Sequence, residues 1–396
     1  MNESATVMAT NLLRDLTTHL PAAIGRLERL VNLDTSSYAV PALTEASRWI
    51  EPQLAALGFR VERHESATTG PVLVGRASGR GRHRVLLLAH YDTVFEPGEP
   101  SRRPFRSEGP RAYGPGVADM KGGIVTLWEA LWGLQRMGWH GYGALTVIHN
   151  ADEEISSIAS RTLIEAEARD ADFCLVLEPG RPHGEIVTAR KGIAHFRLTV
   201  KGKAAHAGVA PQDGASAVVA LARKILAAHA LNDYATGLTL NTIVSKGGAR
   251  SNVVPDEAVA DIDVRIPTLV SGEEVIGRLR AIAEADDLPG TRGVLTGGID
   301  RPPFEPTGKS VALLEIARDA ARALGFTLRN VVTGGGSDGN FVAALGVPVL
   351  DGLGAVGGGY HSPDEYLEVE TIPQRAALVA MTLVEACRRD DFLRAP

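Results

Sequence analysis

Acidic and histidine side chains stand directly after several apolar segments of this 396-residue chain. His90 and Asp92 follow the run RVLLLA, and Asp119 lies in the segment GPGVADMKGG. Imidazole and carboxylate groups bind zinc and also exchange protons with water. The other members of the set follow further segments: Glu153 and Glu154 after ALTVIHN, Glu178 after FCLVL, and His361 in GGGYHSPDEY after VPVL.

Each of these features alone has an ordinary structural explanation. A His-x-Asp pair is often a surface salt bridge, an Asp among glycines is often a turn residue, and a Glu-Glu pair often begins a solvated helix. A buried strand that ends in Glu178 is less usual, because an unpaired buried carboxylate is costly. The combination predicts a metal centre in which five ligands hold two ions, with one further acid left to accept a proton from water.

The elements that would position these groups follow an alternating pattern. Continuous apolar runs at Val85–Leu88 and Phe173–Leu177 are typical of strands buried on both faces, and Ala144–His149 is a third predicted strand. Helical periodicity separates them, which indicates an α/β fold with a mostly parallel central sheet. Sites in such sheets form at the carboxyl ends of the strands. We predict helices at Glu45–Leu57, Gly122–Met137, Ser156–Ala168, Ser310–Leu324 and Thr371–Arg388, a loop from Pro97 to Pro115, and a strand at Ala344–Leu350.

The pattern changes near Lys191. From there the order β-α-β-β-α-β predicts a separate α+β unit of ferredoxin-like type, inserted into the first. We therefore assign residues 1–190 and 303–396 to one domain and 191–302 to the inserted one, with Gly297–Pro306 as the return linker. The inserted domain's predicted strands are Ala194–Gly202, Gly237–Lys246 and Glu257–Pro267, and its helices are Ser216–Ala230 and Ser271–Ala285.

Composition narrows the function classes. Hydrophobic residues make up 44% of the chain and charged residues 22%, as in ordinary globular proteins. A net charge of −6 argues against nucleic-acid binding, which needs a basic surface. Cys174 and Cys387 are too few for a disulfide framework. The first 20 residues lack a basic n-region, and no long apolar run occurs, so we expect a soluble, cytoplasmic protein without membrane contact.

The ordered motifs LLLAHYDTV, GPGVADMKGG, NADEE, LEPG and GYHSPDEY give this chain a specific resemblance to the M20 metallopeptidases. That family includes glutamate carboxypeptidases, aminoacylases, acetylornithine deacetylase and succinyl-diaminopimelate desuccinylase. The chain is most similar to the bacterial glutamate carboxypeptidases in the spacing of these motifs. The resemblance spans roughly residues 20–390 and implies a zinc-peptidase-like catalytic domain.

The resemblance implies a role for each motif residue. His90 and Glu178 would bind one zinc ion, Glu154 and His361 the second, and Asp119 would bridge both. Asp92 would orient His90, and Glu153 would act as general base. Two Zn²⁺ per subunit are expected, with Co²⁺ or Mn²⁺ as alternatives.

In the inserted domain, KGKAAHAGVAP contains His206, which by itself would be an exposed turn residue. The resemblance implies instead that His206 stabilises the oxyanion in the partner subunit's site, and hence that the inserted domain forms a homodimer. Asn252 and Arg265 would bind the substrate carboxylate, with Arg301 as a further candidate, although Arg265 could equally form a salt bridge on the sheet and Arg301 could be a hinge residue. The glycines of TGGGSDGN lack a phosphate-loop signature and would line the substrate pocket.

We therefore predict a metal-dependent hydrolase of an N-acyl or peptidyl amino acid that has a free carboxylate, with a glutamate-type residue favoured. One alternative is an N-acyl-amino-acid deacylase of the acetylornithine or succinyl-diaminopimelate type. Another is a non-catalytic binding protein that retains the fold. The chain departs from the family where Ile155, Ser156 and Ser157 follow the glutamate pair, a position at which glycine is common in the family.

Overall fold

The structure is a computed structural model that describes residues 3–394 and divides into two compact units. The first unit runs to Ala189 and also includes Pro306–Thr333 and the chain from Ser337 onward. The second consists of Arg190–Glu305 together with Gly334–Gly336. The assignment of a catalytic role to the first and a dimerisation role to the second stays a prediction.

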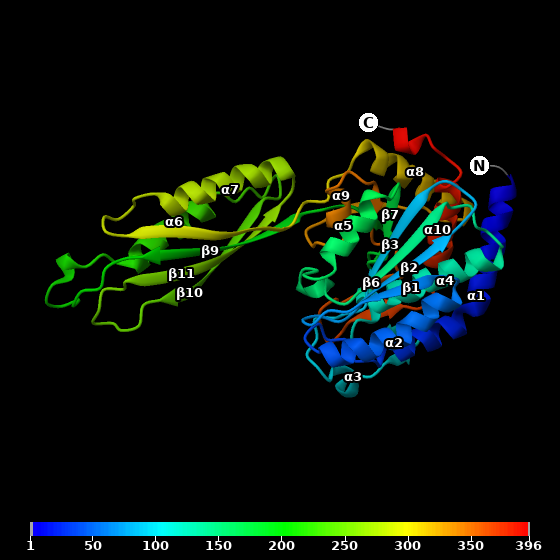
Figure 1. Ribbon diagram of the computed structural model, residues 1–396, viewed down its shortest axis with the longest axis horizontal. Helices are drawn as coiled ribbons and strands as arrows, with labels where there is room; N and C mark the ends of the chain where they lie inside the picture. Colours follow the sequence, from blue (N-terminus) through cyan, green and yellow to red (C-terminus); the bar gives the residue numbers. More distant parts are fainter. Residues whose placement is uncertain (1–2, 395–396) are drawn as a thin grey trace. The chain divides into compact units, whose positions relative to one another are not determined.

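The first unit is built on a six-stranded sheet with the order β1-β2-β6-β3-β7-β14 (Figure 1). Strands β6, β3, β7 and β14 are parallel to one another, whereas β1 and β2 add two antiparallel pairings at one edge. The predicted fold class is confirmed, with a mixed sheet whose parallel part carries the site. The strands are β1 Arg60–His64, β2 Val72–Ser78, β3 Arg84–His90, β6 Ala144–Asn150, β7 Phe173–Val176 and β14 Val349–Leu350.

Helices cover this sheet because its parallel strands are apolar on both faces. Every residue of β3 after Arg84 is buried, as is all of β7. Helix α4 (Gly123–Arg136) packs against α1 (Glu3–Val31) and α10 (Thr371–Ala386), and α10 also packs against α8 (Gly308–Ala323). The remaining helical segments are α2 Val40–Ala56, α3 Glu99–Arg102, η1 Val117–Gly122, η2 Glu153–Ile155, α5 Arg161–Arg169, α9 Gly339–Ala343 and η4 Phe392–Arg394.

Two small sheets complete the first unit. One has the order β15-β16-β5-β4, and in the other β13 pairs with β8, whose last residue, Arg190, begins the second unit. The expected loop from Pro97 to Pro115 therefore contains α3 and the hairpin of β4 and β5. These strands are β4 Arg106–Glu108, β5 Arg111–Tyr113, β8 Ile186–Arg190, β13 Asn330–Thr333, β15 Gly357–Gly358 and β16 Tyr366–Glu368.

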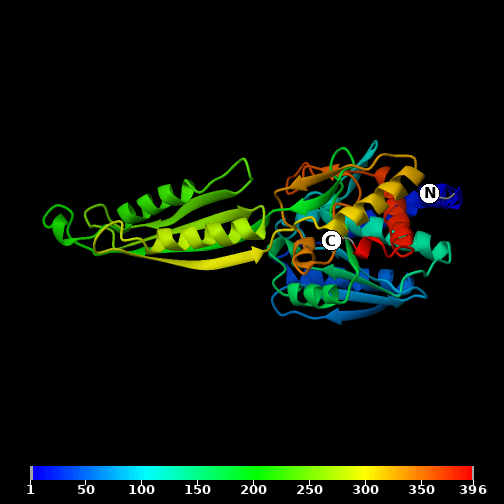
Figure 2. The same ribbon diagram turned by 90° about the horizontal axis from the view of Figure 1, so that it is seen from above.

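The second unit is a four-stranded antiparallel sheet with the order β10-β11-β9-β12. Two helices pack on one face of this sheet, so that the unit has two layers (Figures 1 and 2). Buried and more exposed residues alternate along β9 and β11, as expected for strands with one covered face. Its elements are β9 Gly192–Lys201, η3 Pro211–Asp213, α6 Ala217–His229, β10 Thr239–Gly247, β11 Glu257–Ile266, α7 Leu269–Glu284 and β12 Arg292–Arg301.

Three predicted elements were wrong in part. The proposed linker Gly297–Pro306 begins inside β12, where Gly297 has φ +112° and a register shift follows Ile299. Helix α5 begins only at Arg161, because Ser156 and Ser157 have left-handed backbone conformations that end the preceding 3-10 turn. The predicted strand Ala344–Leu350 is a strand only at Val349 and Leu350.

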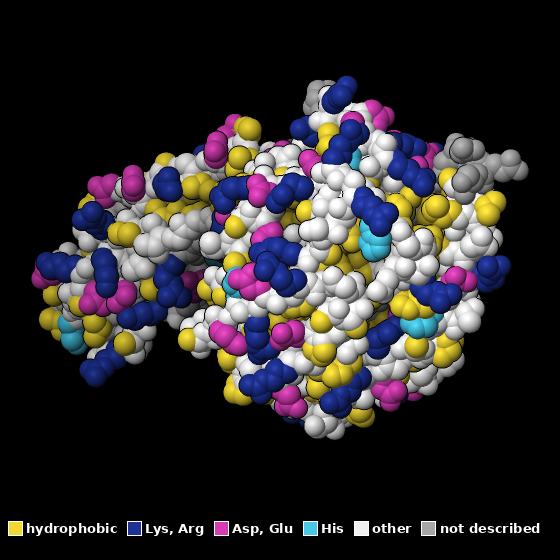
Figure 3. Space-filling view, turned by 45° about the vertical axis from the view of Figure 1, so that its right-hand side comes forward, with side chains coloured by type: hydrophobic (Ala, Val, Ile, Leu, Met, Phe, Trp, Pro, Cys, Tyr) yellow, Lys and Arg dark blue, Asp and Glu magenta, His cyan; other side chains and the backbone are white. Residues whose placement is uncertain are grey.

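The surface shown in Figure 3 carries basic and acidic side chains interspersed among apolar ones. Within residues 3–394, no helix combines the length and the apolar composition needed to cross a lipid bilayer. Both cysteines are free thiols.

Candidate active site

His90 is the last residue of β3 and is almost completely buried. Its Nδ1 atom lies 3.3 Å from Oδ1 of Asp92 and 3.2 Å from the Asp92 carbonyl oxygen. These contacts orient the imidazole so that Nε2 points away from Asp92. Nε2 is buried and makes no hydrogen bond within the described residues, yet it faces two carboxylates.

Asp92 also holds the glutamate pair. Its Oδ1 and Oδ2 accept hydrogen bonds of 3.2 Å from the backbone N–H groups of Glu153 and Glu154, and the Ser37 hydroxyl donates to Oδ2 at 2.8 Å. Glu153 and Glu154 begin the 3-10 turn η2, whose first N–H groups have no partner within the turn. One fully buried carboxylate therefore fixes both the His90 ring and the start of the Glu153–Glu154 turn.

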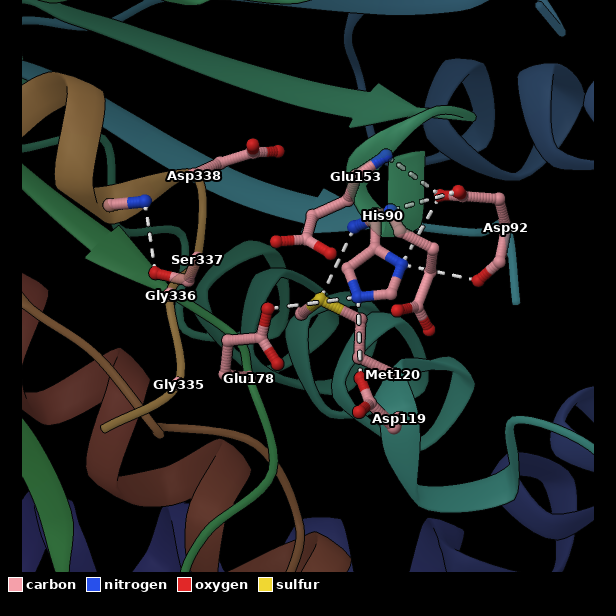
Figure 4. Close-up of polar contacts among 12 residues, drawn as sticks. His90, Asp92, Asp119, Met120, Glu153, Glu178, Gly335, Gly336, Ser337 and Asp338 are labelled. Atoms are coloured by element: carbon pink, nitrogen blue, oxygen red, sulfur yellow. Dashed lines mark hydrogen bonds and ion pairs between the residues drawn. The ribbon is translucent and has the colours of Figure 1, made fainter. Parts of the chain in front are cut away.

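The two carboxylate oxygens of Asp119 face different histidines. Oδ1 lies 3.3 Å from Nε2 of His90, and Oδ2 lies 3.2 Å from Nε2 of His361. His90 Nε2 is also 3.6 Å from Oε1 of Glu178, and His361 Nε2 is 3.4 Å from Oε2 of Glu154. The structure thus brings all five predicted ligands together in two groups that share Asp119. Figure 4 shows Asp119, Glu178 and Glu153 gathered around the His90 imidazole.

These residues fit divalent cations. Zinc binds nitrogen and oxygen at about 2.0–2.2 Å with tetrahedral geometry, which places neighbouring ligand atoms about 3.3–3.6 Å apart. The four separations from the two histidines lie between 3.2 and 3.6 Å. Ligand atoms of His90, Asp119 and Glu154 also lie within 4.8 Å of one another. The unbonded, buried Nε2 of His90 is the atom that a cation would satisfy.

The electrostatics of the cluster agree with this interpretation. Burial, together with the charge of Asp119, raises the pKa of Glu154 well above its usual value. Burial opposes the charged form of Asp119, but the close contacts with the His361 and His90 imidazoles outweigh it and lower the pKa of Asp119. Burial likewise opposes the imidazolium form of His90, yet the adjacent carboxylates of Asp119 and Asp92 raise its pKa. In the absence of cations, protons on His90 and Glu154 offset the negative charge of these clustered carboxylates.

His206 and Asn252 belong to the second unit and are described within it. Both are exposed and lie on adjoining segments: His206 forms a β-bridge with Val253, and the Ala207 N–H donates to the Asn252 carbonyl at 3.0 Å. The Nδ1 atom of His206 accepts hydrogen bonds of 3.2 Å from the N–H groups of Gly208 and Val209. The neutral ring therefore carries its proton on Nε2, which is left free to act as a donor.

Arg265 extends from β11 on the face of the sheet that carries no helices, where Nε and Nη2 donate to the two carboxylate oxygens of Asp263 at 2.8 and 3.0 Å. This bidentate contact is the geometry that guanidinium groups use with carboxylates. Arg301, the last residue of β12, is 3% exposed and packs closely on Gly336, since a Cβ atom there would lie 2.9 Å from its Cδ. The carbonyl groups of Gly335 and Gly336 accept hydrogen bonds from Arg190.

Three buried groups beside the cluster were not predicted from the sequence. Glu365 accepts backbone hydrogen bonds from the segment that carries Asp119, and burial raises its pKa to about 7. Lys121 is fully buried, and burial lowers its pKa to about 7 although the charge of Glu365 acts to raise it. Ser37 donates to Asp92. An acid four residues after His361 was the only available sequence signal, and nothing distinguished Ser37 or Lys121 from ordinary loop residues.

An α/β unit in which His90 and several carboxylates follow parallel strands and His361 completes the cluster, interrupted in sequence by an α+β unit, is typical of metal-dependent hydrolases of C–N bonds. The chain belongs to the Peptidase family M20/M25/M40, whose family model matches residues 86–385. The resemblance inferred from the sequence motifs is therefore confirmed.

Individual relatives agree with this assignment. The chain is 36% identical to Carboxypeptidase G2 of Pseudomonas sp. (strain RS-16), over 94% of this chain and 91% of that protein. It is 28% identical to a succinyl-diaminopimelate desuccinylase of Marinobacter nauticus, over 84% and 91% of the two chains. Among solved structures, aminopeptidase PepT of Bacillus cereus shares the fold, with a TM-score of 0.75, 22% identity, and coverage of 93% of this chain and 99% of that one. The YXEP protein of Bacillus subtilis, described as a dinuclear metal binding peptidase, has a TM-score of 0.68 at 16% identity, and the match covers 95% of this chain and 99% of that one.

Proposed function

We propose that this protein is a di-zinc carboxypeptidase that hydrolyses the amide bond of an N-acyl or peptidyl amino acid with a free carboxylate, with a glutamate-type C-terminal residue favoured. The observation that carries the proposal is that Asp119 directs one oxygen toward His90 and the other toward His361. The 36% identity to Carboxypeptidase G2 supports the substrate class. The desuccinylase relatives favour, as the second candidate, a deacylase with the same metal centre.

His90 and Glu178 would hold one cation, Glu154 and His361 the other, with Asp119 between them. Two such cations, when bound, polarise the scissile carbonyl and make the attacking water more acidic. Zinc is favoured by the nitrogen and oxygen donors, and cobalt and manganese remain alternatives because availability also decides occupancy.

Glu153 is proposed as the general base. Asp92 binds the backbone N–H groups of both Glu153 and Glu154, so the two side chains leave the same turn with separate tasks. Glu154 would face the metal and Glu153 would accept the proton of the attacking water and return it to the leaving amine. His206 would donate a hydrogen bond from Nε2 to the oxyanion that develops on the substrate in a partner subunit's site.

Arg265, with Asn252 and Arg301, is proposed to bind the substrate carboxylate. The Arg265 guanidinium already donates two hydrogen bonds to Asp263, so a substrate carboxylate would have to share or replace these bonds. Replacing the free carboxylate of a substrate with a neutral amide should therefore raise KM strongly with the wild type and much less with Arg265→Ala. Comparing folyl-glutamate, dipeptides and N-acyl amino acids would separate a carboxypeptidase from a deacylase.

A homodimer through the second unit is part of the proposal. Strand β10 is an edge of its sheet, and Ile243 and Val244 on it are each 60% exposed. Helix α6, which contacts β10, exposes Leu226 at 71% and Val219 at 46%. An exposed edge strand beside exposed apolar side chains is usually buried in an interface. We propose that a second copy of this chain forms that interface. A cytoplasmic location stays a prediction.

The decisive experiment compares Glu153→Gln and Glu153→Ala with the wild type. Loss of a general base should lower kcat by about 10²–10⁴-fold while the metal content stays near that of the wild type. Metal content by elemental analysis and kcat on a common substrate are the measurements. Equal turnover by all three proteins would reject the assigned role, and full activity after thorough chelation would reject the metal centre.

A further inference from the structure

A carboxylate that is not among the proposed ligands holds the segment that carries Asp119. Glu365 is the residue before β16 and is 0% exposed. Its Oε1 accepts hydrogen bonds of 2.9 Å from the backbone N–H groups of both Ala118 and Asp119, and Oε2 accepts one of 3.0 Å from Gly116. A carboxylate buried to this degree is costly unless donors satisfy it, and here three donors come from a single turn.

The backbone of that turn is shaped to present these donors. Gly116 has φ +71°, in the left-handed region, and a Cβ atom there would lie 2.4 Å from Cγ2 of Thr93. Only glycine fits this position, and its conformation directs successive N–H groups toward one acceptor. The turn therefore forms a small anion-binding nest that Glu365 fills.

Packing leaves little freedom between the two segments. A Cβ atom on Gly122 would lie 2.0 Å from Cδ1 of Leu367, and one on Gly357 would lie 2.6 Å from Cβ of Ala118. The strands on either side of the His361 loop, β15 and β16, thus pack directly against the turn that carries Asp119. A change in the position of Glu365 would be transmitted to Asp119 because there is no space to absorb it.

We propose that Glu365 is a positioning residue that joins the His361 loop to the Asp119 turn and thereby sets the separation of the two side chains that would share the second cation. This inference rests on the proposed function, because it assigns Glu365 a role in the geometry of the same metal centre. Oδ2 of Asp119 lies 3.2 Å from Nε2 of His361, and Glu365 stands four residues after His361 in the loop. Supporting groups of this kind change metal affinity by about 10–100-fold when they are altered.

Glu365→Gln is the direct test, because glutamine keeps the shape but has one acceptor oxygen in place of two. Its amide NH₂ group would oppose at least one of the three backbone donors. The full-length protein would be stripped of metal and titrated with Co²⁺, with the visible absorption spectrum and calorimetry as readouts. We expect one of the two equivalents to bind about 10–100-fold more weakly, with an altered spectrum, and kcat to fall more than KM rises.

The matched control is Glu368→Gln on β16, whose side chain is 38% exposed and pairs only loosely with Arg111 at 3.7 Å. It should bind Co²⁺ as the wild type does. Amide hydrogen exchange of the peptide around residues 114–122, measured without metal, gives a second readout. Exchange should be faster in Glu365→Gln than in the wild type and unchanged in Glu368→Gln.

The outcomes separate this inference from the proposed function. If the wild type bound no Co²⁺, the metal centre itself would be rejected. If the wild type and Glu365→Gln bound two equivalents with equal affinity and showed equal exchange, only the role of Glu365 would be rejected. If Glu365→Gln does not fold, Glu365→Asp keeps the charge but shortens the reach, and unchanged Co²⁺ affinity in that variant would overturn the proposal.

Discussion

At the scale of single residues, Asp92 makes several contacts that position other residues of the proposed metal centre. It is fully buried, binds the N–H groups of Glu153 and Glu154, accepts from Ser37, and orients His90. Asp92→Asn keeps the shape but replaces one acceptor with a donor. We expect metal affinity and kcat/KM to fall by about 10–100-fold.

Ser37→Ala is the control for that variant, because among the contacts of Asp92 it removes the 2.8 Å hydrogen bond from Ser37 and leaves those to His90 and the glutamates. It also removes the 3.1 Å hydrogen bond from the Ser37 hydroxyl to the Thr93 carbonyl. A few-fold loss of activity is expected. Metal titration and steady-state kinetics on both variants are the measurements. If Asp92→Asn were no more impaired than Ser37→Ala, the orienting role of Asp92 would be wrong.

A second residue, His149, makes the stability of the folded protein depend on pH. Burial lowers the pKa of His149 to about 4, and Trp128 Nε1 donates to its Nε2 at 3.1 Å, which requires that nitrogen to be unprotonated. The folded state then binds fewer protons than the unfolded chain between about pH 6.5 and 4. Stability is therefore present above this window and is lost as the pH falls through it, by about 3 kcal/mol for a complete shift of this size.

His149→Gln removes the titration but keeps an acceptor for Trp128. Urea unfolding at several pH values between 7.5 and 4.5 should show a shallower loss of stability in the variant than in the wild type. Loss of metal in acid would affect both proteins, so the difference between them isolates His149. Parallel curves for the two proteins would contradict the assignment of this acid sensitivity to His149.

At the scale of secondary structure, the contact between α4 and the end of β7 positions a ligand. Gly123 is the first residue of α4, and a Cβ atom on it would lie 1.9 Å from the carbonyl oxygen of Leu177, the residue before Glu178. Gly123→Ala must push the two elements apart. We expect a loss of about 1–3 kcal/mol in stability and weaker metal binding, because Glu178 moves with Leu177.

Gly25→Ala is the matched control for that substitution. Gly25 is exposed in α1, and a Cβ atom there would meet nothing within 4 Å. Alanine should stabilise this helix by about 0.5–1 kcal/mol. Chemical denaturation and metal titration of both variants test the pair, and equal stability of the two proteins would show that the close approach at Gly123 is unimportant.

Secondary structure was predictable from the sequence where burial imposes a pattern on the side chains. The apolar runs before His90, Glu154 and Glu178 predicted the parallel strands, because burial on both faces demands continuous apolar residues. The glycines of β12 were interpreted as a linker, since glycine in a strand carries no periodic signal. Glu365 was missed because its partners are backbone N–H groups of a turn far away in sequence, which no side-chain pattern reveals. The Arg265–Asp263 pair, two residues apart on one face of a strand, was foreseen only as an alternative.

At the scale of the whole molecule, the proposed dimer predicts that each complete site needs two chains. His206 presents an exposed ring whose Nδ1 is held by Gly208 and Val209, leaving Nε2 to donate. If that donor acts in the partner subunit's site, a His206→Ala chain cannot supply the oxyanion donor to its partner. A Glu153→Ala chain lacks the general base of its own site. Each homodimer should lose activity by at least about 10²-fold.

Mixing the two variants under conditions that exchange subunits should restore activity, because the heterodimer has one site with both groups intact. That site would be the one in the His206→Ala chain, which retains Glu153 and receives His206 from the other subunit. Up to half of wild-type activity per heterodimer is expected, measured on heterodimers purified with two affinity tags. A verified heterodimer without recovery would mean that each chain completes its own site, and a protein that sediments as a monomer at assay concentrations would remove the dimer from the proposal altogether.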